Sequence, residues 1–93
     1  MASFIMAMTI NPAAKKMHPD LSHQVNESLE VFTKNHIKLD LYATLGRYDF
    51  LAMFDVPDQT AAFKVAAEIN NMGILETETW PVVSYDEFSR LLK

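Results

Sequence analysis

The chain has 93 residues, a formal net charge of −4 and a sequence pI of about 5.2. Its eight basic residues are scattered along the chain, which argues against a nucleic acid as the partner. Cysteine is absent, so disulfides, thiolate catalysis and thiolate metal sites are excluded. A chain of this length has room for one core, and we expect residues 1–93 to form a single domain.

The N-terminal segment predicts a strand and not a signal peptide. No basic region precedes the short apolar run Ser3–Ile10, and Asn11-Pro12 then supplies a turn signal. No apolar run approaches the roughly 18 residues that are needed to span a bilayer. We therefore expect a soluble, cytoplasmic protein without a membrane partner.

Two helices are predicted from their caps and from apolar residues that recur on one helical face. Asp20 stands at an N-cap position, and the first helix should run from there to about Asn35. Asp58 is the predicted N-cap of the second helix, which Gly73 should end. The apolar faces consist of Leu21, Val25, Leu29 and Phe32 in the first helix, and of Ala62, Val65, Ala66, Ile69 and Met72 in the second.

Alternation of apolar and polar residues predicts two strands, Ile37–Leu45 and Phe50–Val56, that form a hairpin. Apolar positions are odd in the first strand and even in the second, so a shared apolar face requires a loop with an even number of residues. Arg-Tyr is a poor two-residue turn, which favours the four-residue loop Gly46–Asp49. The predicted facing pairs are Leu45–Phe50, Ala43–Ala52 and Leu41–Phe54 on the apolar face, and Thr44–Leu51, Tyr42–Met53 and Asp40–Asp55 on the other.

A fourth strand is predicted from about Ile74 to Val83, and a short terminal helix over Tyr85–Leu92. The elements then follow the order strand, helix, strand, strand, helix, strand. This order predicts an α+β, ferredoxin-like fold, in which both main helices cover one face of an antiparallel sheet.

The second face of the predicted sheet is too apolar for water and too polar for a core. Its predicted members are Ile5, Ala7, Leu51 and Met53, together with Asp40, Tyr42, Thr44, Asp55, Thr77 and Thr79. Such a face suits packing against the same face of another subunit, with a partly polar cavity between them. We therefore expect a homodimer or a higher homo-oligomer. The alternative is a solvated sheet with a few stray apolar residues.

The run Tyr42–Asp58, which reads YATLGRYDFLAMFDVPD, resembles the GYD-domain proteins, a family named for a glycine-tyrosine-aspartate signature. Here the signature is Gly46, Tyr48 and Asp49, with Arg47 at the variable position. The resemblance covers nearly the whole chain and implies a ferredoxin-like subunit related to the dimeric α/β barrels. Related barrel families include cofactor-free monooxygenases, isomerases, haem proteins and sensors, so the fold does not choose a function.

Tyr48 and Asp49 are the candidate catalytic residues, because a hairpin can hold a phenol and a carboxylate at the rim of a pocket for proton transfer. The alternative is turn chemistry, in which Gly46 supplies a positive φ, Asp49 caps the turn and Tyr48 packs over an edge. Turn chemistry explains each of these residue types without a ligand.

The candidate ligand-binding residues are Tyr42, Arg47, Asp55 and Trp80. Tyr42 lies mid-strand on the mixed face, where it would meet a ligand or a partner subunit. Arg47 could hold an anion or remain solvated, and Trp80 is a pocket wall or an interface anchor. If Asp40 and Asp55 face each other, they could share a proton as an acid/base pair, unless the register slips or the strand end frays.

We expect no metal and no cofactor, because the spacing of His18, His23 and His36 matches no compact metal motif. His36 falls at the end of the first helix, where a histidine interacts well with the helix dipole. The sequence predicts a small homo-oligomeric pocket protein of unknown ligand, whose enzymatic form would perform cofactor-independent acid/base chemistry on a small organic substrate. The alternative is a non-enzymatic assembly or regulatory subunit whose sheet face serves only self-association.

Overall fold

A computed structural model describes residues 1–17 and 20–93, and within them it shows four strands and four helices. The elements in chain order are β1 (Ala2–Ile10), α1 (Pro12–Met17), α2 (Leu21–Lys34), β2 (Leu39–Ala43), β3 (Phe50–Val56), α3 (Gln59–Asn71), β4 (Leu75–Val82) and α4 (Tyr85–Leu91).

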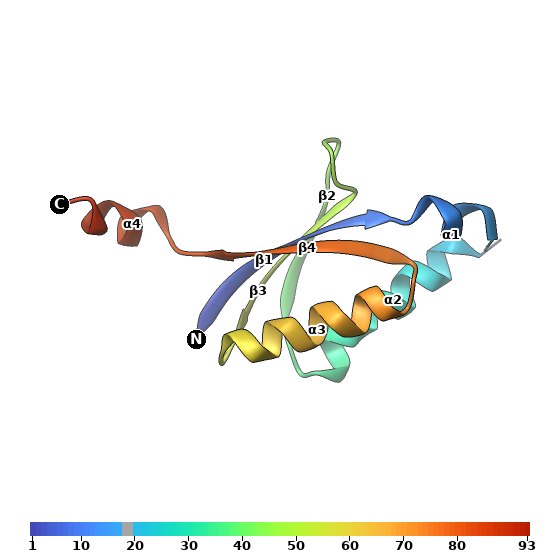
Figure 1. The fold of residues 1–93 in the computed structure, drawn as a ribbon, viewed down its shortest axis with the longest axis horizontal. Coiled ribbons are helices and arrows are strands. Elements are labelled where there is room, and N and C mark those ends of the chain that lie inside the picture. Colours follow the sequence, from blue (N-terminus) through green and yellow to red (C-terminus); the bar gives the residue numbers. More distant parts are fainter. Residues whose placement is uncertain (18–19) are drawn as a thin grey trace.

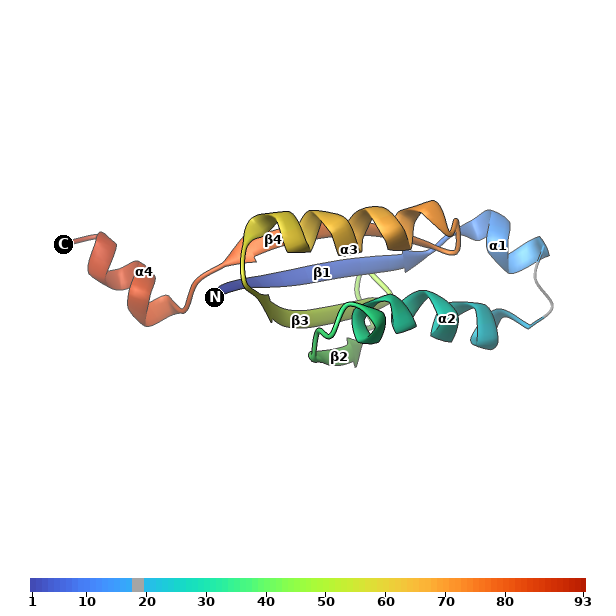
Figure 2. The same ribbon diagram turned by 90° about the horizontal axis from the view of Figure 1, so that it is seen from below.

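The strands form one antiparallel sheet in the order β2-β3-β1-β4. Helices α2 and α3 lie side by side across one face of this sheet (Figure 2). The loop between β2 and β3 rises on the opposite side, away from these two helices (Figure 1). The predicted ferredoxin-like arrangement is confirmed.

The two main helices begin where the sequence predicts. The Asp20 carboxylate accepts a hydrogen bond from the backbone N–H of His23, and the Asp58 carboxylate accepts one from that of Ala61 at 3.0 Å. Gly73 follows α3 with a φ of +77°, a backbone conformation that glycine adopts without steric cost.

Helix α1 is an element that the sequence pattern does not predict. It has only six residues and no apolar period, but Pro12 at its first position has the φ that a helix start needs. The Asn11 side chain accepts a hydrogen bond from the backbone N–H of Ala13 at 3.0 Å. His18 and Pro19, which follow this helix, lie outside the described residues.

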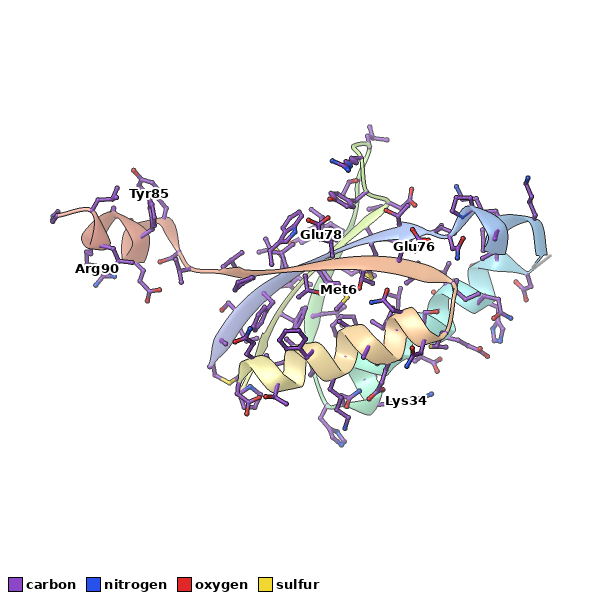
Figure 3. All side chains as sticks on the ribbon, in the orientation of Figure 1. Met6, Lys34, Glu76, Glu78, Tyr85 and Arg90 are labelled. Atoms are coloured by element: carbon purple, nitrogen blue, oxygen red, sulfur yellow. The ribbon has the colours of Figure 1, made fainter. Side chains whose placement is uncertain are left out.

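The core lies between the sheet and helices α2 and α3. Phe32 of α2 is fully buried and meets the ring of Phe54 edge to face at 5.1 Å, and Phe54 stacks on Phe4 at 5.9 Å. Met6 of β1 lies between the sheet and the helices (Figure 3). From the predicted helical faces, Val25, Phe32, Ala62, Val65 and Ile69 are buried, whereas Met72 is exposed.

The hairpin register differs from the prediction by two residues. Ala43 pairs with Phe50 and Leu41 with Ala52, so the apolar sides match, but the loop is the six-residue segment 44–49. The predicted pair of Leu45 with Phe50 is wrong, since Leu45 is fully exposed in the loop. Hydrogen bonds at the base of the loop are the reason, because the backbone N–H of Thr44 donates to the carbonyl of Asp49 in the observed register, whereas the N–H of Asp49 donates to Met8 of β1 and not back to Thr44.

This register also separates two carboxylates that were expected to face each other. Asp40 lies opposite Met53, and Asp55 lies opposite Ser3 of β1, whose hydroxyl donates a hydrogen bond to it. Asp40 and Asp55 are therefore not a cross-strand pair. Tyr42 lies opposite Leu51 and not opposite Met53.

The assignment of Thr77 and Thr79 to the uncovered face is wrong. They pair with Met8 and Met6 of β1, and antiparallel partners share a face, so both threonines lie on the helix side. The face that α2 and α3 leave uncovered, called the open face below, consists of Ser3, Ile5, Ala7, Thr9, Asp40, Tyr42, Leu51, Met53, Asp55, Glu76, Glu78, Trp80 and Val82.

Helix α4 extends away from the rest of the molecule at the end of β4 (Figure 1). None of its residues is buried, although Ser84 caps its start by accepting a hydrogen bond from the backbone N–H of Glu87 at 3.1 Å. The apolar side chains of Tyr85, Phe88 and Leu91 are exposed on it. Among the described residues, no helix has the length and apolarity that a membrane crossing requires.

Candidate functional site

The loop 44–49 crosses the open face and brings Tyr48 to β4. The Tyr48 hydroxyl donates a hydrogen bond of 2.6 Å to one carboxylate oxygen of Glu78, and the Trp80 indole N–H donates one of 2.9 Å to the other. Glu78 lies on the side of β4 from which the loop rises (Figure 3). Tyr48, Glu78 and Trp80 are called the aromatic–carboxylate cluster below.

Ring contacts complete this cluster. The Tyr48 and Trp80 rings meet edge to face, with centroids 5.8 Å apart and an interplanar angle of 75°. The guanidinium carbon of Arg47 lies 5.9 Å from the centroid of the Tyr48 ring, at the outer limit of a cation–π contact. The Tyr48 ring therefore contacts Trp80 of β4, and the Arg47 guanidinium lies over the same ring.

The hydrogen bonds widen the difference between the pKa values of the two acidic groups. The bond from Tyr48, and then the bond from Trp80, lower the pKa of Glu78 from its ordinary value of 4.5. The bond to Glu78, with burial and the carboxylate charge, raises the pKa of Tyr48 above 10.0. At neutral pH the cluster holds a charged carboxylate and a neutral phenol, and the phenol O–H donates its hydrogen bond to Glu78. Tyr48 is thus the hydrogen-bond donor of the pair.

Asp49 ties the loop to the end of β1. Its carboxylate accepts a hydrogen bond of 2.8 Å from the backbone N–H of Ile10, and its own N–H donates one of 2.9 Å to the carbonyl of Met8. Gly46 does not have a positive φ, so that part of the turn interpretation is wrong. The carboxylate of Asp49 is engaged with backbone rather than directed at a pocket.

The other candidate residues lie elsewhere on the open face. Tyr42 is 56% exposed on the edge strand β2. Asp55 lines a hollow of about 570 Å³ with Asp40, at the end of the sheet where β1 begins and β3 ends. The structure therefore brings Tyr48, Trp80 and Arg47 together, and it separates them from Asp55.

Glu78 is the residue that the sequence analysis missed. A usable signal was present, because successive residues of a strand point to opposite faces. Placing Trp80 on the open face requires Glu78 to lie there too, and it excludes Thr79. The pairing with Tyr48, 30 residues away, has no local signal in the sequence.

Within residues 1–17 and 20–93, no group of three histidine or carboxylate side chains is placed to hold a metal ion. Nε2 of His23 instead lies 2.9 Å from Oε1 of Glu27, one helical turn along α2. His36 follows α2 with a φ of +59°.

The arrangement defines a ferredoxin-like protein with a polar cluster on an uncovered sheet face. The family model for the GYD domain matches residues 4–92, and the chain belongs to this family.

Solved structures share the fold at low sequence identity. They include FFRP-DM1, with a TM-score of 0.61, 16% identity and coverage of 89% of this chain and 100% of that one. A feast or famine regulatory protein from M. tuberculosis, complexed with L-methionine, has a TM-score of 0.62 and 14% identity, and the match covers 90% of this chain and 51% of that chain. An antibiotic biosynthesis monooxygenase has a TM-score of 0.59 and 14% identity, and the match covers 90% of this chain and 98% of that chain. No curated protein matches the chain significantly.

Replacing Asp49 tests whether this carboxylate is structural. Asp49→Ala leaves the Ile10 N–H without its acceptor and should lower the free energy of unfolding by about 1–3 kcal/mol. Asp49→Asn keeps an acceptor oxygen and should lower the free energy of unfolding by less. Glu30→Ala, at an exposed position of α2 on the helix side, is the control and should stay within about 0.5 kcal/mol. Urea unfolding measures the stability of all three variants. An Asp49→Ala variant as stable as the parent protein would contradict the structural role of this carboxylate.

A spectrophotometric titration tests the hydrogen bond of the cluster. Tyr48 should ionise above the ordinary tyrosine pKa of 10.0, because its phenolate would form beside the Glu78 carboxylate. Its raised pKa means that the stabilisation is present below pH 10 and is lost as pH rises through the folded pKa. Glu78→Gln should move this late step toward 10, and Tyr48→Phe should remove it. A native-state titration that Glu78→Gln leaves unchanged would contradict the bond.

Proposed function

We propose that the chain is a homo-oligomeric protein that binds a small organic molecule on its open face, between two copies. The observation that carries this proposal is the aromatic–carboxylate cluster beside an uncovered apolar surface. Ile5 and Trp80 are paired, half-buried neighbours on that face, whereas Ala7, which pairs with Glu78, is already buried. A charged carboxylate next to apolar and aromatic surface is a typical pocket lining, and a second copy of the chain would complete the pocket.

The size of the chain and its exposed apolar residues support association. A stable interface buries about 800 Å² on each partner, which is about one eighth of the 6511 Å² of accessible surface on this chain. Met53 on the open face is 45% exposed, and Tyr85 and Leu91 of α4 are about three-quarters exposed. A second copy would remove this apolar surface from water.

Ligand binding is better supported than proton transfer. Tyr48 donates a hydrogen bond to Glu78, and the Asp49 carboxylate accepts one from backbone, so both proposed catalytic groups are engaged within the chain. The Glu78 carboxylate accepts hydrogen bonds from two aromatic side chains, a setting that favours a ligand with a cationic or hydrogen-donating group and a small apolar body. The fold neighbour from M. tuberculosis was solved with L-methionine, a molecule of this kind.

The competing function is an assembly subunit without a ligand. The same apolar positions would serve it, and the cluster would then only hold the loop in place. The two functions differ in one respect, because only a binding protein responds to a small molecule at Trp80.

Native mass spectrometry of the purified protein tests the assembly. A dimer or a higher oligomer is expected, and a retained ligand would add mass to it. Met53→Glu places a charge on the open face and should give monomers, since an unpaired charge is costly in an apolar interface. Phe63→Glu, at a 67% exposed position on the helix side, is the matched control and should leave the oligomer intact. A monomeric parent protein would overturn the proposal.

Intrinsic fluorescence tests the binding, because Trp80 is the one tryptophan of the sequence. Titration with L-methionine should change the Trp80 emission saturably, and an alkyl carboxylate without an amine should bind at least tenfold more weakly (about 1.4 kcal/mol). Glu78→Gln should weaken binding of the amine-bearing ligand. An oligomer whose emission responds to neither probe would favour the assembly subunit.

A further inference from the structure

The molecule carries a projection on its open side and, at the opposite end of the sheet, a hollow that open-face residues line in part. The projection is the loop tip, residues 45–47, which rises away from the helices (Figure 1). Leu45 is fully exposed there, and a Cβ added at Gly46 would meet nothing within 4 Å. A leucine held wholly in water at the tip of an ordered loop is apolar surface without a use in the monomer.

The hollow of about 570 Å³ lies at the other end, where β2 and β1 begin and where β3 and β4 end. Its lining combines apolar and acidic side chains, with Met53 and Val82 beside Asp40 and Asp55. Lys38 and His36 also line it, on the β2 side. The hollow thus offers an apolar floor and two carboxylates.

We infer that the loop tip of one copy seats in this hollow of a second copy, with Leu45 against its apolar floor and Arg47 toward Asp40 and Asp55. The inference deepens the proposed homo-oligomer and rests on it. In this inference Arg47 contacts the partner subunit, and the ligand is bound by Tyr48, Glu78 and Trp80.

Steric considerations favour this pairing of loop and hollow. Two open faces can meet with their loops at the same end or at opposite ends. With the loops at the same end, two projections would collide and hold the sheets apart. With the loops at opposite ends, a twofold axis places each projection over the hollow of the other copy, and both contacts form at once.

The charges favour it as well. The open face carries four acidic side chains, Asp40, Asp55, Glu76 and Glu78. Two such faces repel each other unless cations lie between them. Arg47 is the cation that the loop adds on this side, and its weak contact with the Tyr48 ring leaves its N–H donors free to bind a carboxylate.

A charge swap tests the contact in the full chain. Arg47→Asp and Asp40→Arg should each weaken the oligomer about tenfold, as read from its dissociation on dilution. Because each interface contains both residues, the double variant restores opposite charges and should recover most of the affinity. Lys64→Asp on the helix side makes the same change of charge sign and should have no effect. The inference would be overturned if the single variants had no effect on the affinity of the oligomer, or if the double variant assembled as weakly as the weaker single variant.

Engineered disulfides map the geometry, since the natural sequence has no cysteine. Leu45→Cys combined with Met53→Cys should give covalent oligomers on oxidation, because a disulfide needs Cα atoms within about 7 Å. Leu45→Cys combined with Phe63→Cys, on the helix side, should not. Leu45→Cys alone should stay unlinked, and a covalent dimer from it would show that the tips meet each other.

These results separate the two proposals. An oligomer that persists in the Arg47 and Asp40 variants and does not cross-link overturns the loop-in-hollow contact and leaves the proposed function intact. A monomeric parent protein overturns both.

Discussion

Strand β1 is hydrogen-bonded on both sides, to β3 and to β4, and the burial of its helix-facing side chains holds the molecule together. Phe4, Met6 and Met8 are buried under α2 and α3. Two helices are enough to cover one face of a four-stranded sheet, so the other face of β1 has no helix above it. Ile5 lies half-buried on that face and Met53 of β3 is exposed on it, which is why the chain exposes apolar sheet surface.

The loop between β2 and β3 supplies the chemistry of the open face. It is anchored to β1 by Asp49 and to β4 by Tyr48, so the aspartate and the tyrosine of the GYD signature both make contacts far from the loop in sequence. The same contacts lower the pKa of Glu78 beside two rings, and they leave Leu45 and Arg47 at a projecting tip. One loop therefore carries both structural anchors and residues of the proposed binding function, which depends on that anchoring.

Sequence patterns predicted most elements well where the signal was local. The bounds of β3 and the caps Asp20 and Asp58 agree with the structure, because alternation and capping act within a few residues. The hairpin register was wrong by two residues. Its even loop count was right, but the ladder ends at Asp49, whose N–H donates to Met8 of β1 and not to Thr44, and this contact has no signal in the hairpin sequence.

The sequence by itself determined the fold class, the helix starts, the family signature and the absence of cysteine chemistry, since each depends on residue type or short-range spacing. Only the tertiary structure decided which side of β4 faces the helices, and with it the partnership of Tyr48 and Trp80 with Glu78. It also decided that Asp40 and Asp55 line a hollow without facing each other across the hairpin. The physical reason is that alternation orders the side chains of one strand relative to each other, whereas the pairing with β1 and β3 decides which face they share.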